Sequence, residues 1–125
     1  MPPSDRVPRM ALIGAMQEEL SAVLALMPDA NCETVAGRQF WRGHLHGHEV
    51  VAVLSGIGKV AAAITATVLI EKFQVNRILF TGVAGGLASH VKVGDVVVGN
   101  ELLQHDMNAS PLFPQYEVPL LQYQQ

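Results

Sequence analysis

The sequence contains a single cysteine, Cys32, among 125 residues, which excludes an internal disulfide and indicates a reducing compartment such as the cytoplasm. Positive charge is also scarce. Eight Lys and Arg residues against eleven Asp and Glu residues give a formal net charge of −3, which excludes the basic surface typical of nucleic-acid-binding proteins. Only 15% of the residues are charged, whereas 50% are hydrophobic. Because a small domain has much surface to cover, this composition indicates either a dense core or apolar surface that contacts further chain or a partner.

The sequence has no uninterrupted apolar run that would form a membrane helix. Residues 50–70 are long enough to cross a bilayer, but Gly56 and Gly58 interrupt the stretch and Lys59 lies at its centre, where it would cost about 2.5–3.5 kcal/mol. A buried strand, a turn and a helix explain the stretch better. Residues 1–9 contain three prolines and no apolar run, so we expect a disordered tail there rather than a signal peptide.

The order of the expected elements predicts an α/β fold. Apolar runs and alternation predict strands at residues 10–13, 32–35, 39–45, 49–54, 77–81 and 96–98, and helical periodicity predicts helices at 18–26 and 58–73. Residues 39–54 should form a hairpin. Residues 10–110 would then form one domain with a mixed, largely buried central sheet and flanking helices, followed by an irregular proline-rich tail at 111–125. Two helices are too few to cover both faces of such a sheet, so we expect the layers to be incomplete.

Three glycine-containing segments follow predicted strands. They are Ile13-Gly14-Ala15-Met16-Gln17-Glu18-Glu19, Ser55-Gly56-Ile57-Gly58-Lys59-Val60-Ala61-Ala62, and Thr81-Gly82-Val83-Ala84-Gly85-Gly86, the last followed by Lys92 to Val97 and His105-Asp106. Each segment alone is common in α/β proteins. Together and in this order, over residues 10–106, they resemble the N-terminal half of the 5′-methylthioadenosine/S-adenosylhomocysteine nucleosidases, a branch of the purine and uridine phosphorylase superfamily. The resemblance implies that superfamily's three-layer fold and hydrolysis of an N-glycosidic bond, with release of adenine and without a cofactor.

The first segment carries the candidate catalytic residue. An acid at a helix N-terminus is ordinarily explained by the helix dipole, and we interpret Glu18 in this way. The resemblance instead implies that Glu19 orients and deprotonates the attacking water, a task that suits a carboxylate beside an oxocarbenium-like sugar carbon. A phosphorylase would need an anion site here, and two glutamates would repel phosphate. The segment therefore favours water as the nucleophile.

The resemblance also implies a set of substrate-binding residues. Met16 would lie beside the sugar or the sulfur of the substrate, and Ile57 would line the alkylthio pocket. Core packing is an alternative for both side chains. The loop of Val83, Ala84 and Gly85 would bind the nucleoside, with the purine lying against backbone, although these glycines could serve only the turn. Val83 departs from the serine often found at its position in the family. Ser55 to Val60 is not a phosphate-binding P-loop, because Val60 follows the lysine.

Two further patterns in the sequence could indicate sites. His44, His46 and His48 alternate, but a turn at His46-Gly47 would break their common face, no cysteine or acid lies close except Glu49, and we predict no metal site. By resemblance, the segment around Phe113 would reach across a homodimer interface toward the partner's site.

The resemblance implies functional groups that this sequence does not contain. In the family, an aspartate in the C-terminal half protonates the adenine and a Met-Glu pair there holds the ribose hydroxyls, whereas no aspartate follows Asp106 in this sequence. We therefore expect the 125-residue chain to be inactive, or nearly so, by itself. Two alternatives remain open: a nucleoside phosphorylase, and a truncated, non-catalytic remnant that only binds nucleoside.

Overall fold

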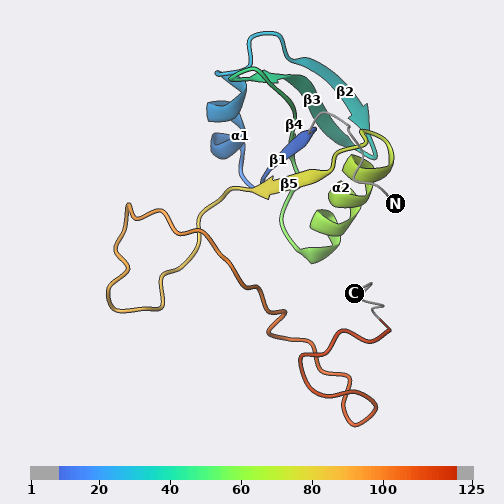
Figure 1. The fold of residues 1–125 in the computed structure, drawn as a ribbon, viewed down its shortest axis with the longest axis vertical. Coiled ribbons are helices and arrows are strands. Elements are labelled where there is room, and N and C mark those ends of the chain that lie inside the picture. Colours follow the sequence, from blue (N-terminus) through green and yellow to red (C-terminus); the bar gives the residue numbers. More distant parts are fainter. Residues whose placement is uncertain (1–8, 121–125) are drawn as a thin grey trace, which may run out of the picture. The chain divides into compact units, whose positions relative to one another are not determined.

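The computed structural model describes residues 9–120, and its regular structure is one mixed sheet with two helices (Figure 1). In chain order the elements are β1 (Met10–Gly14), α1 (Gln17–Leu24), β2 (Asn31–Val35), β3 (Arg38–Leu45), β4 (His48–Leu54), α2 (Lys59–Glu71) and β5 (Arg77–Phe80). The chain divides into two compact units, the first ending at Gly85 and the second beginning at Gly86. All seven elements belong to the first unit.

The five strands run in the order β2-β3-β4-β1-β5. Strand β1 pairs in parallel with both β4 and β5, whereas β2, β3 and β4 pair antiparallel as a meander. This arrangement confirms the predicted mixed α/β fold. The predicted hairpin is also confirmed, because β3 and β4 are joined at His46-Gly47, where both residues have positive φ values of 48° and 80°.

The core lies on both faces of strands β1 and β4. Alternate residues of β1 and β4 separate into two clusters, as the period of a strand requires. The first contains Ala11, Ile13, Val51 and Val53 and packs against Leu69 of α2 and Phe73, which follows that helix. The second contains Leu12, Val50 and Ala52 and packs against Leu20 of α1 and Met27 in the turn after it. The two helices therefore pack on opposite faces of β1 and β4.

The expectation of a largely buried sheet is wrong for β5. Ile78, Leu79 and Phe80 are 42%, 52% and 59% exposed. Consecutive strand residues point to opposite faces, so both faces of β5 are open. The apolar run predicted burial correctly for β1 and β4, which have strand neighbours on each side, but among the described strands β5 has a neighbour only on the side of β1.

The second unit contains no helix or strand within residues 86–120. The prediction of a strand at 96–98 is therefore wrong, and Val96, Val97 and Val98 are exposed. A strand is stabilised only by pairing, and no strand of the described chain pairs with this segment. Residues 111–120 are irregular. Residues 1–8 and 121–125 of the two expected tails lie outside the described residues, and the expected domain boundaries at residues 10 and 110 stay predictions.

Candidate functional site

The candidate site is the edge of the sheet at which the three parallel strands end. Strands β4, β1 and β5 lie side by side and finish at Leu54, Gly14 and Phe80. The loops that follow are tied together by backbone hydrogen bonds: the Ser55 N–H donates to the Gly14 carbonyl at 2.9 Å, and the Thr81 N–H donates to the Ile13 carbonyl at 2.9 Å. Helices α1 and α2 then leave β1 and β4 for opposite faces. In open α/β sheets, ligands bind at such a point, beyond the carboxyl ends of the strands.

Glu19 projects into this edge from the first turn of α1. Its Oε2 atom accepts hydrogen bonds from the N–H groups of Ala15 at 2.8 Å and Met16 at 3.0 Å. A Cβ atom placed on Gly14 would lie 3.3 Å from Oε2, and one placed on Gly82 would lie 3.3 Å from Oε1. The carboxylate therefore lies between the loop after β1 and the loop after β5, in space that two glycines leave open.

These hydrogen bonds favour the ionised form of Glu19. The N–H of Met16 lowers the pKa of the carboxyl below its ordinary value of 4.5, the N–H of Ala15 adds to this, and the N–H of Val83 contributes less, while partial desolvation opposes them. Met16 is the N-cap residue of α1 and Glu19 is the third residue of the helix, so the hydrogen bond between them also caps the helix. The cap holds an ionised carboxylate in a fixed place. A structural role for Glu19 at the helix N-terminus and a catalytic role are therefore compatible.

The other predicted site residues of the first unit surround the same edge. Met16 is 49% exposed, Ile57 is 83% exposed and Val83 is 95% exposed. Core packing, the alternative for Met16 and Ile57, therefore does not hold in this structure. Ala84 and Gly85 are exposed in the loop after β5, and Glu18 is exposed on the first turn of α1. Phe113 lies in the second unit, so its role at a partner's site stays a prediction.

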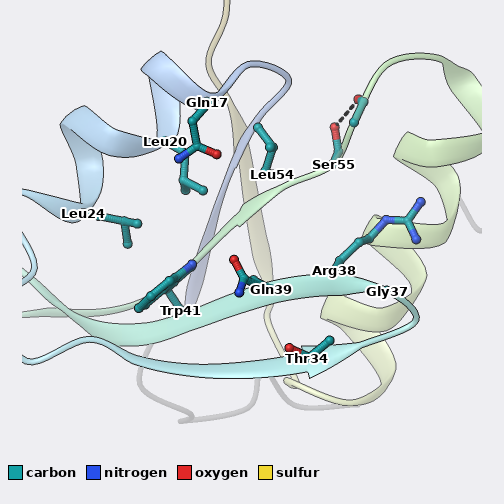
Figure 2. A pocket seen from close by; sticks show the side chains of 11 residues that line it. Gln17, Leu20, Leu24, Thr34, Gly37, Arg38, Gln39, Trp41, Leu54 and Ser55 are labelled. Carbon is teal, nitrogen blue, oxygen red and sulfur yellow. Dashed lines mark hydrogen bonds between the residues drawn. The ribbon is translucent and has the colours of Figure 1, made fainter.

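A hollow of about 640 Å³ lies beside this edge, between α1 and the end of the β-meander (Figure 2). It is lined by Gln17, Leu20, Leu24, Thr34, Gly37, Arg38, Gln39, Trp41, Leu54, Ser55 and Gly56. In Figure 2, Leu20 and Leu24 extend from α1 toward the strand that carries Trp41. The sequence interpretation named none of these as binding residues. Gln17 adjoins Met16 and Gly56 adjoins Ile57, so the hollow borders the predicted site without containing it.

Ser55 fixes the turn that connects the hollow with the predicted site. It is 3% exposed, and its hydroxyl donates to the Gly56 carbonyl at 2.8 Å, the bond dashed in Figure 2. Gly56 and Gly58 have φ values of 80° and 104°, a backbone conformation that favours glycine. The Ser-Gly-Ile-Gly sequence thus turns the chain sharply from β4 and leaves Ile57 exposed at its tip.

The sequence interpretation of the histidines was wrong in one respect, because His44 does have an acidic neighbour. Asp29, in the turn after α1, lies with Oδ2 2.7 Å from His44 Nδ1, and its Oδ1 accepts the His44 backbone N–H at 3.0 Å. The two hydrogen bonds lower the pKa of Asp29, the side-chain bond contributing most. Glu49 pairs instead with Arg9 at 2.8 Å. Within residues 9–120, no group of three or more His, Cys, Asp or Glu side chains could hold a metal ion.

Comparison with known proteins identifies the family. The sequence profile described as the phosphorylase superfamily matches residues 9–125. The chain belongs to the phosphorylase superfamily. A 5′-methylthioadenosine/S-adenosylhomocysteine nucleosidase of Bacillus thuringiensis subsp. konkukian is 44% identical to it over 112 residues, which are 89% of this chain and 48% of that nucleosidase. The chain therefore spans about half the length of the curated superfamily members it matches.

Solved structures of similar proteins share the fold. The nucleosidase of the same name from Colwellia psychrerythraea, solved in complex with adenine, matches with a TM-score of 0.86 and 39% identity over 91% of this chain and 48% of its own. A futalosine hydrolase mutant of Helicobacter pylori matches with a TM-score of 0.83 and 35% identity over 92% of this chain and 53% of its own. This half of the superfamily fold is thus retained in the chain.

Within residues 9–120, no helix has the length and apolar character needed to cross a membrane.

Proposed function

We propose that this chain supplies the water-activating half of a nucleosidase site that hydrolyses the N-glycosidic bond of 5′-methylthioadenosine or S-adenosylhomocysteine. The observation that carries the proposal is the position of Glu19. Its carboxylate is fixed by two backbone N–H groups between the loops after β1 and β5, at the edge where ligands bind in such sheets. The similarity to two proteins named as a nucleosidase and a hydrolase supports water as the nucleophile.

The same hydrogen bonds argue against the phosphorylase alternative. A helix N-terminus binds phosphate through free backbone N–H groups. At α1, the N–H groups of Ala15 and Met16 already donate to the Glu19 carboxylate. A phosphate here would meet an ionised acid instead of unoccupied donors, so the site favours a neutral nucleophile.

In the proposed reaction, the oxygen of a water molecule forms a bond to the anomeric carbon while the bond from that carbon to the adenine nitrogen breaks. The electron pair of the broken bond leaves with the base, and Glu19 accepts the proton of the water. The lowered pKa keeps the Glu19 carboxyl ionised, the form that can accept a proton from water. Protonation of the departing adenine needs a second acid, which in the family that the sequence resembles is an aspartate of the C-terminal half, and no aspartate follows Asp106 in this sequence.

The exposed residues around Glu19 divide between the parts of the substrate. We assign Met16 and Ile57 to the 5′-alkylthio group, since both are exposed apolar side chains at this edge. Ala84 and Gly85 would accept the purine against the backbone, where no heavy atom lies within 4 Å of a Cβ placed on Gly85. We further propose a cytoplasmic homodimer in which Phe113 contacts the partner's site. The reaction needs no metal and no organic cofactor.

Isotope labelling tests the proposed reaction. The chain is joined to the part of the Bacillus thuringiensis nucleosidase outside the matched region, and adenine release from 5′-methylthioadenosine is followed in water enriched in ¹⁸O. We expect label at the anomeric oxygen of the sugar product and a rate that does not depend on added phosphate. An unlabelled sugar phosphate, formed only when phosphate is present, would establish the phosphorylase instead.

The 125-residue chain alone should release adenine at no more than a small fraction of the joined chain's rate. General acid catalysis contributes about 10²–10⁴-fold, and the isolated chain lacks the acid. Rapid turnover of 5′-methylthioadenosine by the isolated chain would contradict the proposed division of the site. Binding of the nucleoside by the joined chain without adenine release would favour the non-catalytic alternative.

A further inference from the structure

Two glycines flank the carboxylate of Glu19, one from each of the loops that meet at the candidate site. A Cβ atom placed on Gly14 would lie 3.3 Å from the Cβ atom and 3.3 Å from the Oε2 atom of Glu19. A Cβ atom placed on Gly82 would lie 3.3 Å from the Oε1 atom. A side chain at either position would therefore meet the carboxylate, Gly14 at one oxygen and Gly82 at the other.

The backbone at these two positions does not itself require glycine. A glycine with a positive φ is explained by its conformational freedom, and the described chain has five of this kind: Gly37, Gly47, Gly56, Gly58 and Gly94. Gly14 and Gly82 are not among them, so an alanine could adopt their backbone conformation. What glycine provides at these two positions is space.

The atoms beside Gly14 have little freedom to recede. Besides the Glu19 atoms, the nearest is the backbone nitrogen of Leu20 at 3.7 Å, and the Leu20 side chain is buried in the core. A methyl group on Gly14 would therefore displace either α1 or the carboxylate. Because Oε2 accepts the N–H groups of Ala15 and Met16, either displacement would stretch those hydrogen bonds.

At Gly82, the carboxylate shares its space with an aromatic ring. A Cβ atom there would lie 3.2 Å from Cε1 and 3.5 Å from Cζ of Phe80, as well as 3.3 Å from Oε1 of Glu19. Phe80 is 59% exposed, so its ring can shift toward solvent, whereas the carboxylate is held at its other oxygen by Ala15 and Met16. Oε1 accepts neither of those two hydrogen bonds, which leaves it as the oxygen that can face a water molecule.

We propose that Gly14 and Gly82 are positioning residues for the carboxylate of Glu19. Gly14 leaves room for Oε2 against its backbone donors, and Gly82 leaves room for Oε1 beside the attacking water. This role rests on the proposed function, because it serves the step in which Glu19 accepts a proton. A methyl group at Gly82 should lower kcat by about tenfold, since catalysis depends steeply on the placement of the reacting groups. KM should change less than kcat, because the displaced group acts on the water.

Carbon-13 NMR of the full 125-residue chain tests the geometry without a measurement of activity. Side-chain carboxyl signals of labelled glutamate are titrated, and the Glu19 signal is assigned by its loss in Glu19→Gln. The backbone N–H groups hold the pKa of Glu19 below 4.5, so we expect Gly14→Ala and Gly82→Ala to raise this pKa toward 4.5. Gly99→Ala is the matched control, because its Cβ atom would meet only the Leu102 side chain, at an ordinary contact distance of 3.5 Å. It should leave the pKa unchanged.

Kinetics of the joined chain test whether the glycines act through Glu19. Gly82→Ala is introduced into the unsubstituted enzyme and into Glu19→Gln, and kcat and KM are measured for adenine release. We expect a loss of about tenfold in the first background and no further loss in the second, since the base is already absent there. Circular dichroism shows whether each variant folds. If Gly82→Ala does not fold, Glu19→Ala in the same chain should restore folding by removing the crowded oxygen, and a failure to restore it contradicts the inference.

Two further results would overturn the inference. The first is a Glu19 pKa that stays as low in either folded alanine variant as in the unsubstituted chain. The second is a loss of kcat from Gly82→Ala that is as large in the Glu19→Gln enzyme as in the unsubstituted one. The proposed function fails separately, if Glu19→Gln itself leaves kcat unchanged. If Glu19→Gln lowers kcat but Gly82→Ala does not, the proposed function stands and the role of the glycines is refuted.

Discussion

At the scale of the residue, the proposed function depends on one carboxylate, that of Glu19, which has two roles. The Gly-Ala-Met-Gln-Glu-Glu segment was enough to select Glu19 over Glu18 as the candidate base. It did not indicate that Glu19 would accept the N–H groups of Ala15 and Met16, because that contact depends on how the chain turns from β1 into α1. This turn both ionises the acid and removes the donors that a phosphate would need.

The pair of Asp29 and His44 shows what local patterns cannot predict. The residues are 15 positions apart and are joined only when the turn after α1 reaches β3. From the sequence, His44 could be compared only with its neighbours, His46, His48 and Glu49. The folded chain gives His44 a partner that no spacing rule would select.

This pair predicts a pH-dependent contribution to stability. The pKa of Asp29 is lowered in the folded chain, so its stabilising effect is fully present above the ordinary value of 3.8 and is lost as the pH falls through the lowered pKa. Asp29→Asn should therefore lower the thermal unfolding midpoint at pH 7, and its difference from the unsubstituted chain should shrink as the pH falls below 3.8. Circular dichroism melts from pH 7 to pH 2 measure this. Glu101→Gln, at an exposed position of the second unit, is the control. A difference that stays constant over this range would contradict the prediction.

At the scale of the element, local patterns predicted the segments that complete their own pairing. The hairpin of β3 and β4 and helix α2 were predicted because the hydrogen bonds that define them are local: the two strands pair across a short turn, and the helix lies within residues 59–71. The strand at 96–98 was not confirmed, and the burial of β5 was overestimated. In both cases the apolar sequence is present, but within residues 9–120 no strand pairs with residues 96–98 and none pairs with the outer edge of β5. An apolar or alternating sequence indicates that a segment can pair as a strand, but it does not indicate whether a partner strand is present.

A close approach between two elements gives a second prediction. A Cβ atom on Gly43 of β3 would lie 2.9 Å from Asp29 Oδ1 and 3.1 Å from the Cα atom of Ala30, so the turn after α1 packs directly on this glycine. Gly43→Ala should destabilise the chain by about 1–3 kcal/mol, the usual cost of overpacking. Gly85→Ala, which places its Cβ in open space, is the matched control and should leave stability unchanged. Urea unfolding of both variants decides between them, and equal midpoints would contradict the predicted packing.

At the scale of the whole molecule, the chain carries a sheet edge and a set of apolar side chains that its described residues do not cover. Besides the three apolar residues of β5, the exposed large hydrophobic residues of the first unit include Ile57, Val60, Ile64 and Ile70 on and before α2. Composition alone predicted apolar surface in excess. Its location could not be read from composition, since the same apolar runs are buried in β1 and β4.

This surface predicts self-association. Contiguous exposed apolar patches and open strand edges promote contacts between copies, so the purified chain should show a concentration-dependent increase in mass during sizing chromatography with light scattering. Addition of the other part of the domain should reduce that increase. Behaviour as a single monomeric species at all concentrations tested would contradict the account of an uncovered sheet.

The central claim, that the carboxylate of Glu19 activates water, is tested most directly by comparing two neighbouring glutamates. In the chain joined to the remaining part of the Bacillus thuringiensis nucleosidase, kcat for adenine release is measured for Glu19→Gln and for Glu18→Gln. We predict that Glu19→Gln lowers kcat by about 10²–10⁴-fold, as loss of a general base does, whereas Glu18→Gln leaves kcat unchanged. A Glu19→Gln enzyme that turns over as fast as the Glu18→Gln enzyme would contradict the claim.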